Sequence, residues 1–320
     1  MINRRDASTI PAGAEHKLLA TYGLSDTKPM AVGTEAVVYA LGDDRVLKVY
    51  ADPTQRDVLD TLREFHDRLD TSGVPWTVPR IHSITRHGEL LAVVEDRVPG
   101  TTMDTHALGA EDPELEQLYL QTARQIGTLK VDPPLRRRRL LPAPGTTPGG
   151  DSDWNAFITS LVAGKLLTVA PILRGDIPDI DTRAEQLLDR FTGLYDGPES
   201  VVHGDFYPGN ILMTDRASVS GVIDFGSFTM IGDPLYDLAT ACAFWRMYEP
   251  DHRTARNRLL AAATAGLPAQ HHRRLLDYLL VAALTTCDLY PEPDRPIQAT
   301  GHYQWARDIL RDNTYWQLTP

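Results

Sequence analysis

The strongest constraint on the fold of this chain is a change of hydrophobic period at Pro99-Gly100. Before this point apolar residues recur at every second position, which is typical of strands with one buried face. After it they recur at helical spacing over long segments. We therefore predict an α+β fold in two lobes. The N-terminal lobe covers residues 1–98 with a hinge at about 94–100, and the mainly helical C-terminal lobe covers 99–320.

The N-terminal lobe is predicted to be an antiparallel five-stranded sheet with one main helix. Gly42-Asp43-Asp44 and Arg86-His87-Gly88 are turn signals that suit tight hairpins. Residues 54–69 place apolar side chains on one face of a helix. The expected strands are 29–32, 36–41, 46–50, 80–84 and 90–98, and a short helix is expected at 15–22.

The C-terminal lobe is predicted to be helical except near residues 201–225. The segment 136–150 joins a run of arginines to a stretch rich in Pro, Gly and Thr, and it is expected to be a mobile surface loop. Contact of its arginines with phosphate groups or an anionic partner is the alternative. The expected helices are 111–131, 153–173, 181–195, 234–248, 254–265, 269–289 and 302–312.

The composition predicts a soluble, cytoplasmic protein. A chain of 320 residues with 42% hydrophobic residues is too apolar for disorder. Its N-terminal segment has two arginines without an apolar stretch behind them, and its longest apolar run, 278–284, is far shorter than a membrane span. Cys242 and Cys287 lack metal-ligand spacing and are expected to be buried small hydrophobes.

The net charge of −11 lies mainly in residues 99–320, which contain 28 acidic and 20 basic residues. This balance argues against a nucleic-acid partner, which would require a basic face. It favours a cationic small-molecule partner, although acidic side chains kept for solubility explain the same balance. The sequence is compatible with a monomer or a homodimer.

Polar residues typical of catalysis concentrate in two segments, VVHGDFYPGNILM (201–213) and SGVIDFG (220–226). Short apolar runs predict strands here, so Asp205, Asn210 and Asp224 are expected at strand ends or in the loop between them. Phosphoryl transfer needs a carboxylate that holds the attacking hydroxyl and oxygen ligands that fix Mg²⁺ across the phosphates. These residues supply both.

The spacing of these residues matches the catalytic pattern of kinases. Asp205 and Asn210 have the spacing of the H-R-D-x-x-x-x-N loop, and residues 224–226 are D-F-G. As an alternative, Asp205 could open a turn, Asn210 occupy a left-handed position and Asp224 close a strand. Either motif alone is compatible with that structural role, but the two in this order favour catalysis.

With GDPLYDLA (232–239) added, the motifs resemble those of the aminoglycoside and choline kinase-like phosphotransferases: H-G-D-x-x-x-x-N, I-D-F/W-G/E and G-D-P-x-x-D-L-A. The resemblance spans most of the chain and implies a bilobal protein-kinase-like fold that uses ATP or GTP with Mg²⁺. It implies that Asp205 is the catalytic base and that Asn210 and Asp224 are Mg²⁺ ligands. Asp237 would brace the catalytic loop.

Two departures from protein kinases indicate a small acceptor. Gly204 replaces the arginine that would pair with an activation-loop phosphate. The interval from Asp224 to Asp233 is too short to form an activation segment that docks a peptide.

Lys48, in the predicted strand VLKVY, is expected to bind the nucleotide phosphates. The alternative is a lysine on the solvated face of a strand. By the family pattern, an acid on the helix of the N-terminal lobe holds this lysine. Glu64 is the candidate, and Asp57 and Asp60 are rivals with shorter side chains.

Two further segments are expected to contact the nucleotide because of their position in the motif order. Gly33 and Thr34 lie where a phosphate-covering loop is expected, although an ordinary hairpin explains the same residues. Backbone groups around Glu95 and Arg97 are expected to meet the purine at the hinge, with a plain strand end as the alternative.

Other candidate residues favour structural roles. His203 is expected to pack beneath the loop, because Asp205 already serves as the base. A set of aromatic residues in the helical lobe could bind a sugar or macrocycle, but packing in the core is favoured. The set is Phe244, Trp245, Tyr248, Tyr303, Trp305, Tyr315 and Trp316.

We therefore predict a Mg²⁺-dependent kinase that phosphorylates a hydroxyl of a small molecule, with an antibiotic as the favoured acceptor. A metabolic kinase for choline, homoserine or a sugar is the alternative enzyme. A nucleotide-binding pseudokinase scaffold is the alternative from another class, and the intact set of Lys48, Asp205, Asn210 and Asp224 speaks against it.

Overall fold

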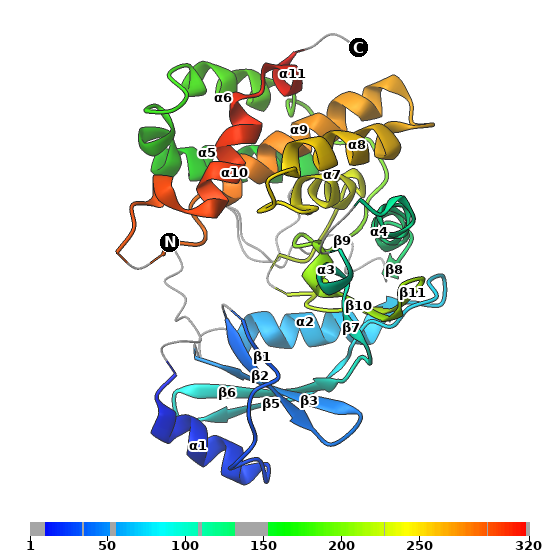
Figure 1. The fold of residues 1–320 in the computed structure, drawn as a ribbon, viewed down its shortest axis with the longest axis vertical. Helices are drawn as coiled ribbons and strands as arrows, with labels where there is room; N and C mark the ends of the chain where they lie inside the picture. The colour runs from blue at the N-terminus through cyan, green and yellow to red at the C-terminus, as the bar shows by residue number, and fades with distance from the viewer. Residues whose placement is uncertain are drawn as a thin grey trace. The chain divides into compact units, whose positions relative to one another are not determined.

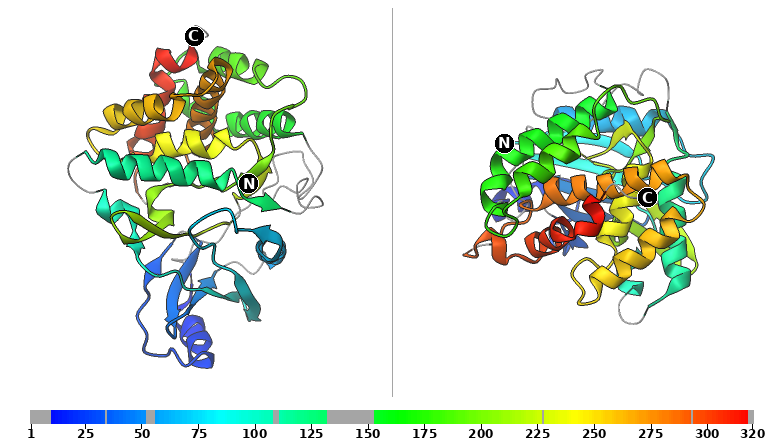
Figure 2. Two further views of the ribbon diagram at one scale, coloured as in Figure 1. Left: turned by 90° about the vertical axis from the view of Figure 1, so that its right-hand side faces the viewer. Right: turned by 90° about the horizontal axis from the view of Figure 1, so that it is seen from above.

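The computed structural model describes residues 10–33, 35–51, 56–107, 111–131, 153–226, 228–292 and 294–317. The chain divides into two compact units, one of Met1–Thr101 with Ile211–Ser227 and one of Thr102–Asn210 with Phe228–Pro320. Figures 1 and 2 show the sheet of the first unit and the helices of the second. The predicted surface loop at 136–150 lies outside the described residues.

The first unit contains the predicted five-stranded antiparallel sheet, in the order β1-β2-β3-β6-β5. Its helix α1 (Ala12–Thr21) packs Leu18 and Leu19 against one face, and α2 (Arg56–Arg68) lies on the other face (Figure 1). The strands are β1 (Ala31–Val32), β2 (Ala36–Leu41), β3 (Arg45–Tyr50), β5 (Ile81–His87) and β6 (Leu90–Asp96), and the short β4 (Leu69–Asp70) follows α2.

Side-chain alternation along β3 sets the two faces of this sheet. Leu47 and Val49 are fully buried on the face that α1 covers. Because successive side chains point to opposite faces, Lys48 lies on the face of α2. One strand therefore supplies both core residues and a charged candidate for function.

The hairpin of β10 (Ile211–Asp215) and β11 (Ser218–Val222) also belongs to the first unit, which the sequence analysis did not indicate. Thr77, which lies between β4 and β5, makes two backbone hydrogen bonds with this hairpin. Its amide donates to the Ser220 carbonyl (2.9 Å), and its carbonyl accepts from the Val222 amide (3.0 Å). Gly221 permits this approach, since a Cβ there would lie 2.7 Å from the Thr77 carbonyl oxygen. Residues 211–227 therefore depart from the predicted lobe of 99–320.

The second unit is mainly helical, and each predicted helix is present. The helices α3 and α11 were not predicted because a single turn is too short to show a helical period. The elements are α3 (Met103–His106), α4 (Pro113–Ile126), β8 (Lys130–Val131), α5 (Trp154–Leu173), α6 (Ile180–Asp189), β9 (Ser200–Val202), a 3-10 turn (Pro208–Asn210), β12 (Met230–Gly232), α7 (Leu235–Phe244), α8 (His252–Thr264), α9 (Ala269–Thr286), a 3-10 turn (Ile297–Ala299), α10 (Gly301–Arg311) and α11 (Asn313–Trp316); β7 (Thr101–Thr102) precedes α3.

Helix α7 is the centre of the second unit. Every residue from Tyr236 to Phe244 is buried, and α4, α8 and α9 pack around the helix. A helix that is apolar on all sides is typical of a protein core or a membrane span, and the helices packed around α7 show that it lies in a core. Asp237 is the charged residue of this buried helix.

Helix α5 is long and apolar enough to cross a membrane by length and composition, with a mean hydropathy of 1.8, and no other helix in the described ranges meets this test. The core helix of a soluble protein meets the same test. Trp154, Phe157 and Ile158 at its start are buried, and α5 packs against α9 and α6.

Gly232 ends β12 at a place where no side chain fits. A Cβ there would lie 2.1 Å from the ring of Trp154. That ring is fully buried, and its Nε1 donates to the Tyr278 hydroxyl (2.6 Å). The glycine of the GDPLYDLA motif is therefore required by packing.

We expect Gly232→Ala to lower the free energy of unfolding by about 1–3 kcal/mol, the usual cost of overpacking a core. Urea unfolding measures this change. Gly175→Ala is the matched control in the same unit, because a Cβ there makes an ordinary contact with the Ile172 carbonyl oxygen at 3.7 Å. Equal midpoints for the two variants would contradict the role of Gly232.

Candidate active site

The HGD turn of the predicted catalytic loop requires glycine in its middle position. Gly204 follows β9 with a φ of 80°, a backbone conformation that side chains rarely adopt. A Cβ on this residue would also lie 2.1 Å from the Phe228 carbonyl oxygen. Conformation and space therefore both exclude the arginine that protein kinases have at this position.

Asp237 holds this turn from the first turn of α7. Its Oδ2 accepts from the His203 amide (2.6 Å) and its Oδ1 from the Gly204 amide (2.9 Å). The residue is 1% exposed, and this burial raises its pKa to about 7, against the two amide donors and with the charge of Asp205 adding to the rise. The bracing role expected for Asp237 is confirmed.

Asp205 is the half-buried carboxylate at the centre of the loop. Its backbone carbonyl accepts from Asn210 Nδ2 (2.9 Å), while its amide donates to His203 Nδ1 (3.3 Å). Asn210 is 5% exposed, and its own amide donates to the Tyr207 carbonyl oxygen (3.0 Å). The Asp-to-Asn spacing thus closes a loop whose two ends are tied to each other.

His203 lies beneath the loop, as expected. It is fully buried, and its ring contacts that of Phe206 edge-on, with centroids 6.1 Å apart. The Thr229 hydroxyl donates to its carbonyl oxygen (3.3 Å). These contacts support a packing role.

Buried aromatic residues support the loop from below, and one of them, Tyr119, was not singled out from the sequence. Tyr119 of α4 stacks on Phe206 (centroids 5.1 Å apart), and its hydroxyl donates to the Phe206 carbonyl oxygen (3.2 Å). Trp245, after α7, packs on the other side of Tyr119 (4.9 Å). The apolar period of α4 marks Tyr119 as buried, but nothing in the sequence pairs it with the loop.

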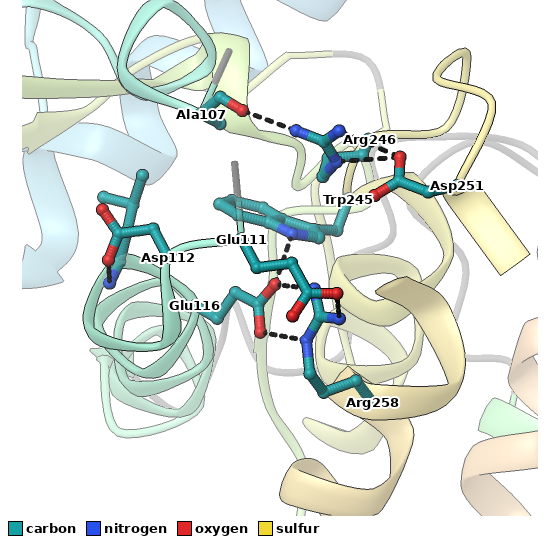
Figure 3. A network of polar contacts seen from close by, with 9 residues as sticks. Ala107, Glu111, Asp112, Glu116, Trp245, Arg246, Asp251 and Arg258 are labelled. Carbon is teal, nitrogen blue, oxygen red and sulfur yellow. Dashed lines mark hydrogen bonds and ion pairs between the residues drawn. The ribbon is translucent and has the colours of Figure 1, made fainter. Parts of the chain in front are cut away.

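A charged network fixes Trp245 in turn (Figure 3). Its Nε1 donates to Glu116 Oε1 (3.1 Å), and Arg258 of α8 donates to both carboxylate oxygens of Glu116 (2.8 and 2.5 Å). Glu111 binds the same guanidinium (2.5 Å). Such a two-point Arg–carboxylate contact fixes geometry as well as charge.

The first unit contains the remaining candidate residues. Asp224 follows β11 with a φ of 65°, an uncommon value for a residue other than glycine and one that is found at functional sites. Its side chain is 56% exposed, whereas Phe225 is buried with its ring 6.1 Å from that of His66. Burial, together with the charges of Lys48 and Arg80, lowers the pKa of His66 to about 3.

Lys48 is held by two carboxylates. Its Nζ lies 3.0 Å from Glu95 Oε2 and 3.1 Å from Asp224 Oδ1. Burial alone would lower its pKa, but these two charges raise it well above the ordinary value. The carboxylate that was expected on Lys48, Glu64, pairs with Arg68 on the next turn of α2 (3.1 Å). Glu95 of β6 occupies the position expected for Glu64.

The other residues predicted to contact the nucleotide lie in the β1–β2 hairpin and at the end of β6. Gly33 is part of the hairpin between β1 and β2, where its amide donates to the Ala36 carbonyl (2.9 Å); Thr34 lies outside the described residues. Glu95 has paired strands on both sides, and the Arg97 amide donates to the Asp44 carbonyl (2.9 Å). The purine contact of this backbone stays a prediction.

Most of the aromatic set from the helical lobe packs in the core, which is the role that the sequence favoured. All its members are buried except Tyr248, which is 62% exposed. The Tyr248 hydroxyl bonds His302 Nδ1 (3.0 Å), and the ring of Tyr290, itself 43% exposed, lies 4.8 Å from that of His302.

The sheet of the first unit, the helices of the second and the HGD and DFG segments define a phosphotransferase of the protein-kinase-like class. The chain belongs to a family whose model is described as "Phosphotransferase enzyme family" and matches residues 26–278. The resemblance to aminoglycoside and choline kinase-like phosphotransferases is thereby confirmed. This protein is a phosphotransferase that acts on a hydroxyl group of a small molecule.

Solved structures of aminoglycoside phosphotransferases share the fold. The GDP complex of aminoglycoside 2'-phosphotransferase-IIIa has a TM-score of 0.62 at 15% identity, over 92% of this chain and 97% of that one. The gentamicin complex of APH(2")-IIa gives 0.60 at 14%, over 96% and 98%. ADP-bound APH(2'')-Ib gives 0.57 at 14%, over 94% and 97%. No curated protein matches the chain.

The pKa of Asp237 predicts a pH-dependent stability. Between the usual aspartate value near 4 and about 7, the folded state keeps a proton that the unfolded chain has released. The resulting stabilisation is complete below about pH 4 and is lost as the pH rises through about 7.

We therefore expect the stability advantage of the wild type over Asp237→Asn to shrink as the pH rises from about 4 to 7, by up to about 1.4 kcal/mol per pH unit. Urea unfolding of both proteins across this range measures it. The other titrating groups cancel in the difference. A difference that is constant with pH would show that Asp237 is ionised throughout.

Proposed function

We propose that this phosphotransferase moves the γ-phosphate of ATP or GTP onto a hydroxyl of an antibiotic, with Asp205 as the base. The observation that carries the proposal is the fixed backbone around this half-buried carboxylate. Asp237 binds the two preceding residues, and Asn210 binds the Asp205 carbonyl. In a loose transition state the base mainly orients the hydroxyl, so a rigid loop is what the chemistry requires.

Mg²⁺, when bound with the nucleotide, supplies positive charge to the phosphates that react. The donor set suits this ion: the Asp224 carboxylate is exposed, and Asn210 uses its amide nitrogen for Asp205, which turns the amide oxygen away. Mg²⁺ typically takes one or two protein carboxylates besides phosphate oxygens and water. The described ranges contain no group of three or more His, Cys, Asp or Glu residues that could hold a metal ion.

Lys48 is proposed to bind the phosphates of the nucleotide. Its side chain is 13% exposed. Burial acts to lower its pKa, but the charges of Glu95 and Asp224 raise the pKa well above the ordinary value, so the ammonium stays charged. A point charge of this kind both binds and orients phosphate groups.

An antibiotic is the acceptor that the similar structures favour, since two of them were solved with gentamicin and streptomycin. The acidic net charge of −11 suits a cationic acceptor. A choline, homoserine or sugar kinase has the same chemistry and is the alternative. A cytoplasmic location, where ATP and GTP are available, belongs to the proposal.

We include Tyr248 in the acceptor surface. Its ring is exposed and its hydroxyl bonds His302, and its pKa is raised, first by partial burial and then by the charge of Asp205. Exposed tyrosine rings bind sugar rings and cationic groups. Tyr290 and His302 extend the same aromatic surface.

The first test is Asp205→Asn, which keeps the shape of the side chain but removes the charge and the proton acceptor. We expect kcat to fall by at least about 10²-fold, with the nucleotide Kd nearly unchanged. Candidate acceptors come from a resistance screen of cells that express the protein. Acceptor-dependent turnover beside nucleotide titration gives both constants. Near-normal kcat would remove Asp205 from the mechanism, and nucleotide binding without turnover in the wild type would support the scaffold alternative.

The second test is Tyr248→Ala, which we expect to raise the acceptor KM by about tenfold, in line with roughly 1 kcal/mol or more for an aromatic contact. The nucleotide Kd should not change. Tyr248→Phe is the matched control, because it keeps the ring and loses only the hydroxyl contact to His302. Equal acceptor KM values for wild type and the Ala variant would exclude Tyr248 from the acceptor surface.

A further inference from the structure

Glu95 and Lys48 are diagonal neighbours on one face of the sheet in the first unit. Glu95 lies opposite Val46 in the register of β3 and β6, and Val46 and Lys48 share a face because they are two residues apart. Diagonal side chains on one face are within reach when one of them is long. The 3.0 Å contact is therefore set by strand register.

This pair is the most buried ion pair of the first unit among the described residues. The side chain of Glu95 is 6% exposed and that of Lys48 13%. A buried carboxylate is costly unless a charge and hydrogen bonds compensate it. Lys48 supplies both, so neither side chain can leave the other without a penalty.

Two acids of α2, Asp60 and Glu64, pair with arginines of the same helix. Asp60 pairs with Arg56 (2.6 Å) and Arg63 (3.2 Å), and Glu64 pairs with Arg68 (3.1 Å). These are exposed pairs within one helix, which contribute little to stability. The helix thus has its own charge pattern, separate from the pair on the sheet.

We propose that Glu95 is the positioning residue for Lys48, and that this phosphotransferase orients its phosphate-binding lysine from a neighbouring strand of the sheet instead of from helix α2. This inference rests on the proposed nucleotide-binding role of Lys48. Because backbone pairing fixes the register of β3 and β6, the contact between Glu95 and Lys48 is set within the sheet.

A consequence concerns the second partner of Lys48. Glu95 fixes the ammonium from within the sheet, whereas Asp224 meets it from an exposed position after β11. When a nucleotide–Mg²⁺ complex binds, the contact to exposed Asp224 is the one that can be exchanged for phosphate, and the contact to buried Glu95 is retained.

The test uses the five lysines of the chain, Lys17, Lys28, Lys48, Lys130 and Lys165. In a protein labelled with ¹³Cε-lysine, NMR can resolve the signals of these lysines separately. The signal that is lost in Lys48→Arg belongs to Lys48. We expect Glu95→Gln to move the Lys48 signal at a fixed pH, because the ammonium loses the carboxylate that lies 3.0 Å away. The matched control is Glu89→Gln in the exposed turn before β6, which should leave that signal unchanged.

Nucleotide titration of the same variants supplies the functional readout. We expect Glu95→Gln to weaken ADP and GDP binding by about tenfold or more, the range for a hydrogen bond to a charged group. Unchanged or tighter binding would overturn the proposal, since Glu95 would then only repel the phosphates. A larger effect of Glu64→Gln on Lys48 would overturn it in favour of the helix.

Two controls keep the outcomes distinct. If the wild type binds neither nucleotide, the proposed function fails, while the NMR signal of Lys48 still reports on the Lys48–Glu95 pair. If Glu95→Gln does not fold, Glu95→Asp takes its place, because it keeps the charge and shortens its reach. A Lys48 signal and a nucleotide affinity equal to those of the wild type in that variant would overturn the proposal.

Discussion

The structure around the candidate base depends on one buried carboxylate. Asp237 of α7 accepts the amides of His203 and Gly204, and these two bonds fix the backbone that presents Asp205. An ionised group in such a core is costly, and burial raises the pKa of Asp237 to about 7. Two amide donors oppose that rise, so the loop and the carboxylate stabilise each other: without the turn, the charge would lack partners.

The two units stabilise their charged groups by different means. In the second unit a carboxylate binds backbone amides, and stacked aromatic rings close the space beneath the loop. In the first unit a lysine binds two carboxylates, and neither contact involves the backbone. The carboxylate of the second unit fixes a backbone conformation, whereas the carboxylates of the first unit keep the lysine charged. This division fits a reaction in which the base must be placed accurately and the phosphate contact must be exchanged on binding.

Hydrophobic period predicted most of the fold because it depends on local spacing. The five strands, the main helix of the first unit and the long helices of the second were placed from it, and Asp237 followed from its motif. Glu95 could not be predicted as the partner of Lys48, because their contact depends on the register of β3 with β6, far apart in sequence. The packing of 211–227 with the first unit depends on backbone bonds to Thr77, which leave no trace in composition.

The glycines of the motifs show where sequence patterns encode packing as well as chemistry. Gly204 combines a left-handed φ with contact to a carbonyl oxygen, and Gly232 lies against the ring of Trp154. Neither residue can contribute a side chain to catalysis. A side chain would collide with the Phe228 carbonyl oxygen at Gly204 and with the Trp154 ring at Gly232. Because Asp237 reaches the loop only at hydrogen-bond distance, a displacement of a few tenths of an ångström would weaken both amide bonds. Gly204, whose amide is one of the two donors, therefore acts on the base through distance.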